Sequence, residues 1–414
     1  MNVHVNKPVP IEFAQVVKAY RKVRKGGKAA GIDNESWVVF DKNVEDNLYV
    51  IWNRLASGSY HPQAVREVEI PKKDGKMRRL GIPTLRDRIA QQVVKDYMEK
   101  KIDRLFHENS YGYRPMKSAH QAIEQVRQNC YRQDWVIDMD ISKFFDEIDH
   151  ELMLRAVTHV IADKWVAIYI KRWLEMPIQR QDGTLHSKAG KGTPQGGVIS
   201  PLLANLYLHY AFDMWLTKHY EGVSFVRYAD DIVVHCTSKT EAEEVLEAIK
   251  QRLHEVGLQI KEEKTRIAYC KDYRRKAKHE VVKFEFLGFS YQPRARRSNK
   301  DGKLFMAFAA EISQSNQKKI RTLIREAKVW RNTSLCVPDI ANHLNVKLRG
   351  WINYYGKYSK RSLRNALITI DRKLIKWLCK KHKIGYRKAD MKLKVLRQTH
   401  PRMFYHRERG CCWY

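Results

Sequence analysis

Two adjacent aspartates, Asp230 and Asp231, are the residues of this sequence whose types and spacing best suit chemistry. They lie between two Val-rich apolar runs in the stretch 225–235, which predicts a β-hairpin with both carboxylates at its tip. Adjacent carboxylates repel each other and suit a strand poorly, and a bound cation resolves that conflict. Mg²⁺ prefers hard oxygen ligands, commonly one or two carboxylates together with substrate phosphates. A solvated hairpin turn is the alternative when the pair is considered alone.

A second strand with carboxylates is expected upstream, over residues 135–140. Asp138 and Asp140 share one face of it, because side chains alternate along a strand. A carboxylate in an apolar strand is costly unless it is paired or binds metal. We therefore expect Asp140 to be a metal ligand, and Asp138 to be a supporting or exposed residue.

Three loops could approach anionic groups. The Gly-rich loop 190–201 exposes backbone N–H groups, and its Ser200 is the expected N-cap of the next helix. The hairpin 64–82, with an Asp-Gly turn, brings two cations to one place. The basic loop 24–33 has glycines that let the backbone approach phosphates. Each also has a plainer interpretation, as a sharp turn, a solvated hairpin or an ordinary connection between helices.

The elements that would position these residues follow from apolar periodicity and turn signals. In the first three quarters of the chain, helices are expected over 11–25, 85–106, 117–131, 151–158, 163–176, 202–217 and 240–256. A short hairpin is expected over 178–188 and an aromatic strand over 284–289. From about residue 311 the pattern predicts helices only, over 314–331, 337–355 and 361–381.

The charge of the chain points to a polyanionic partner. Its 414 residues include 78 Lys or Arg against 46 Asp or Glu, a net charge of +32, which favours nucleic acid. Residues 311–414 alone carry 26 Lys or Arg and six acids. Aromatic side chains interleaved with these cations suit stacking on unpaired bases. A basic solvated face over aromatics in a helical core is the alternative.

Several classes of protein are disfavoured by the same sequence. No apolar run approaches the roughly 20 residues of a membrane-spanning helix, and the first residues have no signal-peptide core. Seven cysteines are scattered without a C-x-x-C spacing, so a zinc site is not expected. Their scatter instead favours a reducing, cytosolic compartment. The length favours two or three structural units.

Taken together, these motifs resemble a reverse transcriptase of the group II intron type, over about residues 11 to 380. The resemblance rests on Tyr228-Ala229-Asp230-Asp231, on the Gln195–Pro201 block, on Asp140 followed by Phe144-Phe145-Asp146, and on Leu348–Tyr355, which looks like a maturase thumb. It implies an α+β right-hand polymerase with fingers, a palm with an antiparallel sheet and an all-α thumb. It places the N-terminal extension and fingers in 1–110, the fingers and palm core in 111–310, and the thumb or maturase domain in 311–414.

The resemblance also implies roles for single residues. Two Mg²⁺ ions would be held at Asp140, Ile141, Asp230 and Asp231, and the three aspartates would be the catalytic residues. The incoming nucleotide would contact Lys72, Arg78, Phe145, Gln195 and Lys264, of which Phe145 excludes a 2′-hydroxyl and Lys264 protonates the leaving group. The primer, template and RNA would contact Arg24, Lys25, Lys28, Arg114, Leu287, Gly288, Arg349, Trp351, Tyr354 and Lys357.

The implied activity is RNA-directed DNA synthesis from dNTPs on an RNA template and a DNA primer. The protein would also bind group II intron RNA as a splicing maturase and support retromobility, in the bacterial cytosol and without a membrane partner. No H-N-H endonuclease segment follows the thumb, so cleavage of a second DNA strand is not expected. Two alternatives stay open: a maturase whose polymerase activity has lapsed, and a related reverse transcriptase recruited to host defence or DNA repair. The sequence does not indicate an oligomeric state.

Overall fold

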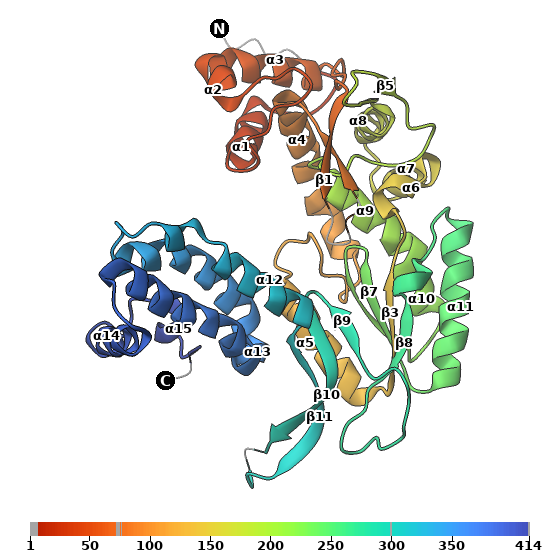
Figure 1. Cartoon of the computed structure of the whole chain (residues 1–414). Coiled ribbons are helices and arrows are strands. Elements are labelled where there is room, and N and C mark those ends of the chain that lie inside the picture. Colours follow the sequence, from red (N-terminus) through yellow and green to blue (C-terminus); the bar gives the residue numbers. More distant parts are fainter. Residues whose placement is uncertain (1–6, 72–74, 76, 299, 413–414) are drawn as a thin grey trace. The chain divides into compact units, whose positions relative to one another are not determined.

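The computed structural model describes residues 7–71, 75, 77–298 and 300–412 of the chain. The protein divides into two compact units. Unit 1 comprises residues 1–125 and 139–265, and unit 2 comprises 126–138 and 266–414. Both contain helices and mainly antiparallel strands (Figure 1), so the α+β class is confirmed.

Unit 1 begins with helices that pack together near the N-terminus (Figure 1). They are α1 (Phe13–Arg24), α2 (Trp37–Phe40), α3 (Val44–Ala56) and α4 (Leu85–Ile102). The Thr84 side chain caps α4 by accepting a hydrogen bond from the backbone N–H of Asp87. α4 also buries polar side chains, among them Arg88 and Gln91, which must find partners inside the protein. The helices predicted at 11–25 and 85–106 are confirmed.

A four-stranded sheet follows, in the order β2-β1-β4-β5. Its strands are β1 (Val65–Pro71), β2 (Met77–Ile82), β4 (Ile178–Gln179) and β5 (Leu185–His186). The β1–β2 and β4–β5 pairs are antiparallel hairpins, as predicted, and β1 runs parallel to β4. This places Arg78 of the β1–β2 hairpin near the segment that leads into the Gly-rich loop.

The second sheet carries the carboxylates and has the strand order β6-β7-β3-β8. Its strands are β3 (Trp135–Asp140), β6 (Ser224–Tyr228), β7 (Asp231–Cys236) and β8 (Arg266–Tyr269). Of these, β6, β7 and the end of β3 belong to unit 1, and β8 with residues 135–138 of β3 belongs to unit 2. Tyr228 pairs with Asp231, so the β6–β7 turn consists of two residues, Ala229 and Asp230. Ala229 has a φ of 58°, a left-handed conformation that suits a tight hairpin. The predicted hairpin and the strand at 135–140 are confirmed.

Helices α6 (Phe144–Glu147), α7 (His150–Val160), α8 (Lys164–Glu175), α9 (Ser200–Leu208), α10 (Met214–His219) and α11 (Lys239–Glu255) complete unit 1. The helix predicted over 202–217 is interrupted by a π-helical turn, His209–Asp213. The prediction of Ser200 as N-cap was wrong: Ile199 occupies the cap position. The Ser200 hydroxyl lies 3.0 Å from that of Thr193 and links the loop to the helix.

Unit 2 contains a three-stranded sheet in the order β11-β10-β9. The strands are β9 (Phe284–Phe286), β10 (Phe289–Arg297) and β11 (Leu304–Ile312). The strand predicted over 284–289 was wrong in its extent, because Leu287 and Gly288 both have positive φ and form a turn after β9. The long β10–β11 hairpin was not predicted. The helix expected at 117–131 is α5 (Ala119–Arg132).

The rest of unit 2 is helical, as expected: α12 (Gln314–Arg325), α13 (Val337–His382), α14 (Tyr386–Thr399) and α15 (Tyr405–Glu408). The helix predicted over 314–331 was too long, because α12 ends at Arg325 and a separate 3₁₀ turn, Lys328–Arg331, follows. The two helices predicted at 337–355 and 361–381 form the single element α13, which is kinked at Ser359. Its buried face, including Leu348, Leu363 and Leu367, forms a core with α12, α14 and α15. Among the described residues, no helix has the length and apolarity needed to cross a bilayer.

Candidate active site

The carboxylates of Asp140 and Asp230 influence each other in unit 1. Burial raises the pKa of the Asp230 carboxyl, and the negative charge of Asp140 raises it further. Arg78 and Lys264 act in the opposite direction on the same carboxyl. Lys264 Nζ donates to Asp140 Oδ2 at 2.8 Å. The structure therefore brings together two carboxylates, Asp140 and Asp230, and two cations, Arg78 and Lys264, which come from distant parts of the sequence.

This pair fits a divalent cation, which would offset both the burial that mainly raises the pKa of Asp230 and the repulsion from Asp140. Asp231 is half-buried at the start of β7, and Ile141 is buried beside Ile260, so only the main-chain carbonyl of Ile141 could be a ligand. Within the described part of the chain, no three His, Cys, Asp or Glu side chains form a complete metal site. Substrate oxygens would therefore have to complete the coordination, as is usual for Mg²⁺.

A buried ion pair stabilises the turn that carries Asp230. Arg227 and Asp213 are fully buried, and the guanidinium donates to the two carboxylate oxygens at 2.7 and 2.5 Å. Arg227 also donates to Asn205 Oδ1 at 3.0 Å and to the Ala229 carbonyl at 3.2 Å. The π-helical turn places Asp213 opposite Arg227, and such turns are frequent at functional sites.

A loop at residues 109–114 supports the same turn. Asn205 Nδ2 donates to the Gly112 carbonyl at 2.6 Å, and Tyr111 N donates to the Arg227 carbonyl at 2.8 Å. A Cβ at Gly112 would lie 2.4 Å from the backbone nitrogen of Ala229, so only glycine fits. No role was predicted from the sequence for Arg227, Asp213, Asn205 or Gly112, although a buried arginine in an apolar strand is a signal for a structural pair.

Phe145 lies in the short helix α6, after Asp140, and only 9% of it is exposed. Its carbonyl accepts a hydrogen bond from Thr193 N at 2.7 Å, and Gly192 N donates to the Ile148 carbonyl at 2.7 Å. The Gly-rich loop is therefore fixed to the segment that carries Phe145. Gln91 holds the other end of this loop, because its amide oxygen accepts from Val198 N at 2.8 Å.

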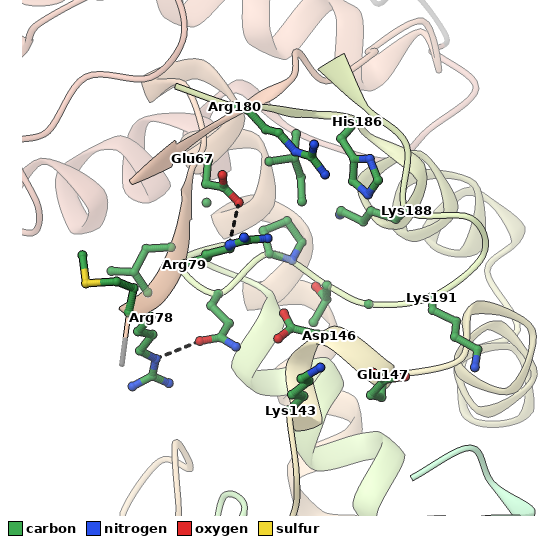
Figure 2. Close-up of a pocket in the computed structure, with 18 residues that line it drawn as sticks. Glu67, Arg78, Arg79, Lys143, Asp146, Glu147, Arg180, His186, Lys188 and Lys191 are labelled. Carbon is green, nitrogen blue, oxygen red and sulfur yellow. Dashed lines mark hydrogen bonds and ion pairs between the residues drawn. The ribbon is translucent and has the colours of Figure 1, made fainter. Parts of the chain in front are cut away.

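Arg78 and Gln195, both predicted to contact the nucleotide, are direct partners: Arg78 Nε donates to Gln195 Oε1 at 2.8 Å. They line a cavity of about 550 Å³ between the β1–β2 hairpin, the β4–β5 segment and the loop after β3 (Figure 2). The cavity walls carry more cations than acids, including Lys143, Arg180 and Lys191. Its chemistry therefore suits phosphate groups.

Lys188 is a further cation of this cavity (Figure 2). Burial lowers the pKa of its ammonium group to about 7, and Nζ donates to the Leu174 carbonyl at 3.2 Å. Lys72, the second cation predicted for the nucleotide, lies outside the described residues. In the same hairpin, Arg79 forms an ion pair with Glu69 at 3.5 Å.

The N-terminal loop that was predicted to cover the template is anchored by a buried arginine. Arg88 donates to the Pro83 carbonyl at 3.0 Å and to the carbonyls of Gly27 and Ala29. Arg24 is paired with Asp41 at 2.8 Å and stacks over Trp37. The side chains of the remaining two predicted residues of this loop are exposed: Lys25 and Lys28.

Arg114 was predicted to contact nucleic acid, but its guanidinium is largely enclosed. It donates to Asp103 Oδ1 and to the carbonyls of Asp103, His107 and Ser110, each at 2.8 Å. Only 6% of its side chain is exposed. These contacts give Arg114 a structural role, which is to hold the 107–114 loop.

In unit 2, the predicted primer-contacting turn Leu287-Gly288 is tied to α12 and α13. Tyr354 Oη donates to the Leu287 carbonyl at 2.9 Å, and Asn316 Nδ2 donates to the Gly288 carbonyl at 3.1 Å. Phe289, directly after the turn, packs against Tyr354 and Tyr355. The turn and the predicted thumb residue Tyr354 therefore belong to one structure.

The other predicted thumb residues divide between core and surface. Trp351 packs against the helical core and is only partly exposed. Arg349 and Lys357 are exposed, and their charges lie over the rings of Tyr405 and Tyr358. These two cations are therefore available to phosphates.

Comparison with known proteins identifies the same family that the sequence motifs resemble. A family described as "Reverse transcriptase (RNA-dependent DNA polymerase)" matches residues 70–291, and one described as "Group II intron, maturase-specific domain" matches residues 314–395. Protein YkfC of Escherichia coli (strain K12) is 33% identical over 286 residues, which is 60% of this chain and 74% of the relative. The group II intron-encoded protein LtrA of Lactococcus lactis subsp. cremoris is 28% identical over 444 aligned positions, covering 87% of this chain and 71% of the relative.

Among solved structures, a telomerase from Candida albicans aligns with a TM-score of 0.45 at 10% identity, over 86% of this chain and 68% of that one. The family assignment rests on the sequence matches, which cover more than half of the chain. The carboxylate pair and the Gly-rich loop lie in the first matched segment, and α12 and the whole of α13 lie in the second. The chain therefore belongs to the reverse transcriptase family, the RNA-directed DNA polymerases, and is of the group II intron type.

Proposed function

We propose that this protein extends a DNA primer from dNTPs on an RNA template with two Mg²⁺ ions, and that it binds a group II intron RNA as splicing maturase and in retromobility. The observation that carries the polymerase proposal is that β3 and β7 are neighbours in one sheet, which brings Asp140 at the end of β3 to the turn that carries Asp230, with Lys264 Nζ 2.8 Å from Asp140 Oδ2. Reverse transcriptases generally use divalent metal ions. Asp140, Asp230, Asp231 and the Ile141 carbonyl are the proposed ligands.

Bound Mg²⁺ would lower the pKa of the primer 3′-hydroxyl and neutralise charge on the departing pyrophosphate. The chain's own residues would do the positioning. Arg78 would bind the triphosphate, held in place by Gln195, and both would keep the nucleotide against the Gly-rich loop. Lys264, paired with Asp140 in this structure, would give a proton to the leaving group. Phe145, fixed through Thr193, would close the space below the sugar.

The RNA role is assigned to residues 311–414 with the Leu287-Gly288 turn, and the fingers and N-terminal extension to residues 1–110. The exposed Arg349 and Lys357 support this assignment, as does the excess of cations in the C-terminal quarter of the chain. Lys25 and Lys28, exposed on the N-terminal loop, would approach the template. All seven cysteines are free thiols, which supports a reducing compartment such as the bacterial cytosol.

Primer extension on an RNA template tests the polymerase proposal. Asp140→Ala and Asp230→Ala should each reduce Mg²⁺-dependent synthesis by several orders of magnitude, because removal of a metal ligand forfeits several kcal/mol of transition-state stabilisation. Asp46→Ala, which removes an exposed carboxylate of α3, is the matched control and should keep parental activity. Parental synthesis by either active-site variant would remove that residue from the proposed metal site.

RNA binding across a salt series tests the maturase proposal. Neutralising the exposed cations Lys347, Arg349 and Arg361 should flatten the dependence of affinity on salt, by about 0.9 in log–log slope for each phosphate that the protein no longer neutralises. Asp230→Ala should bind structured RNA as the parent does, and should still promote splicing of its intron. An unchanged slope in the cation variants would mean that these helices do not bind RNA.

A further inference from the structure

A cavity of about 700 Å³ lies within unit 2, and its lining includes none of the proposed metal ligands or nucleotide-contacting residues. The end of α5 and the loop that follows β8 form one side, the β10–β11 hairpin forms the floor, and Lys357 with its neighbour in α13 forms the other side. We call it the hairpin groove. Its lining is mostly apolar, with alanines of β11 in the floor, and no role in nucleotide transfer requires it.

Large aromatic side chains of this groove are exposed to solvent rather than packed in the core. Tyr131 is 60% exposed, Tyr273 is 52% exposed and Phe305 is 38% exposed. Tyr273 and Phe305 meet edge to face with ring centroids 5.9 Å apart. Exposed aromatic faces cost hydration free energy when they have no partner, so a cluster of them indicates a binding surface.

Cations surround these rings. The Arg274 guanidinium lies 4.0 Å from the ring centroid of Tyr131 and 5.8 Å from that of Tyr273. Arg132 and Lys357, both exposed, also line the groove. Its acid, Asp272, is already neutralised by Arg274, whose Nη2 lies 2.7 Å from Oδ2. The groove therefore presents aromatic faces within a net positive field.

We propose that the hairpin groove binds unpaired nucleotides of RNA, with bases stacked on Tyr131 and Tyr273 and phosphates near Arg132 and Lys357. Every base has a π-face, so stacking on tyrosine accepts any sequence, and nearby cations hold the backbone. A protein partner is the competing occupant, but it would need an acidic surface with apolar side chains at its centre. The positive charge of the groove favours RNA, because every nucleotide combines a negative phosphate with a flat base.

This inference rests on the proposed RNA-binding function and adds a second place of contact to it. The predicted contacts at Arg349 and the Leu287-Gly288 turn concern the helical face and the primer. The hairpin groove instead would take single-stranded segments that lie beside a paired region. Intron RNAs contain such segments at loops and junctions, where bases are free to stack.

The test uses the full chain and two RNA hairpins with the same stem, one blunt and one with about eight unpaired nucleotides at its 3′ end. The parent should bind the tailed RNA more tightly than the blunt one. Tyr131→Ala with Tyr273→Ala should lose at least about thirtyfold in affinity for the tailed RNA, since each stacked base is worth about 1–3 kcal/mol, and little for the blunt RNA. Tyr49→Ala, which removes a tyrosine that is 55% exposed in α3, is the matched control.

Photocrosslinking of the parent to a tail that carries 4-thiouridine provides a measurement that does not depend on any variant. Crosslinks should map to peptides that contain Tyr131, Tyr273 or Phe305. Crosslinks only elsewhere, or an undiminished preference for the tail in the double variant, would overturn the proposal and leave the groove to a protein partner. If the parent binds neither RNA, the proposed RNA-binding function itself fails, a result distinct from loss of the tail preference alone.

Discussion

The buried ion pair of Arg227 and Asp213 stabilises the conformation of the turn that carries Asp230. An arginine that is fully buried must have its charge and its donors satisfied, and Asp213, Asn205 and the Ala229 carbonyl do this together. The Ala229 carbonyl belongs to the turn itself, and Asn205 also donates a hydrogen bond to Gly112 in the 109–114 loop that packs against the turn. The position of the carboxylates proposed as catalytic therefore depends on residues that are not themselves proposed to contact metal or nucleotide.

Asp213→Asn should lower the free energy of unfolding by about 3–5 kcal/mol, because it leaves the buried Arg227 charge uncompensated. Chemical denaturation measures this change. Glu243→Gln is the control, since it breaks an exposed pair with Lys239 in α11 and should change stability by less than about 0.5 kcal/mol. An Asp213→Asn protein as stable as the parent would contradict the importance given to this pair.

Phe145→Ala should admit ribonucleotides, because the side chain proposed to lie below C2′ of the sugar is removed. The backbone anchor of the residue, from Thr193 N to its carbonyl, does not depend on the side chain and should survive. Competition between dNTPs and rNTPs during primer extension is the measurement. Unchanged discrimination in a variant that still makes DNA would assign the gate to another residue.

Among the secondary-structure elements, the β6–β7 hairpin was predictable because Val-rich runs flank a two-residue turn, and β3 because its apolar run is short and bounded. The β10–β11 hairpin was not predicted. Its first strand contains Pro293 and a run of arginines, which argue against a strand, although Asp301-Gly302 is a turn signal. The interruption at Ser359 was anticipated, since the predicted helices end at 355 and resume at 361, but the structure has a kink within one element there rather than a connecting loop.

The site was predictable only in part, for a physical reason. Asp140 in an apolar strand, Asp230 at a hairpin tip and Arg78 beside a hairpin turn could be singled out from the sequence pattern, whereas the roles of Gln195 and Lys264 were implied only by the resemblance to reverse transcriptases. Supporting interactions, such as Gln91 holding the Gly-rich loop, join residues more than 100 positions apart. No local pattern encodes a partner at that distance, so the structure was needed to find it.

Gly112→Ala tests how closely the 109–114 loop must fit the turn that carries Asp230. The added methyl group would meet the backbone nitrogen of Ala229 at 2.4 Å, where nothing flexible can yield, so the turn must shift. DNA synthesis should fall at least tenfold, since small displacements of catalytic groups are costly. Gly385→Ala at the start of α14 meets no atom within 4 Å and should keep parental synthesis. Equal rates for the two variants would contradict the close fit.

At the scale of the whole molecule, the C-terminal end of the chain contributes to stability. Asp371 in α13 pairs with Arg397 at 3.1 Å and with Arg407 at 2.5 Å, and Cys411 is buried against the same helical core. These interactions join α13, α14 and α15. The sequence suggested no role for residues 409–414, because the partners lie tens of residues upstream.

His406 makes the stability of this end sensitive to acid. It is 1% exposed, neither ring nitrogen has a hydrogen-bond partner in the structure, and burial lowers the pKa of the imidazole to about 4. Below about pH 6.5 the His406 imidazole is therefore protonated in the unfolded chain, whereas in the folded chain it stays neutral down to about pH 4. Stability should fall as the pH drops from 7 to 5, by about 2 kcal/mol from this residue.

Thermal or denaturant unfolding of His406→Leu against the parent measures this contribution. The variant should lose less stability than the parent between pH 7 and pH 5, since leucine does not titrate. A comparison of slopes is needed rather than of absolute stabilities, because the substitution also changes packing next to Phe404. Identical pH slopes in the two proteins would contradict the lowered pKa of His406.

The most direct test of the proposed chemistry is whether Asp230 itself binds the metal ion that DNA synthesis requires. Asp230→Cys should make almost no DNA on an RNA template with Mg²⁺, and should recover part of its activity with Mn²⁺, which accepts a sulfur ligand more readily. The parent and Asp46→Cys, an exposed control, should be active with Mg²⁺. Near-parental synthesis by Asp230→Cys with Mg²⁺ would contradict the proposed site.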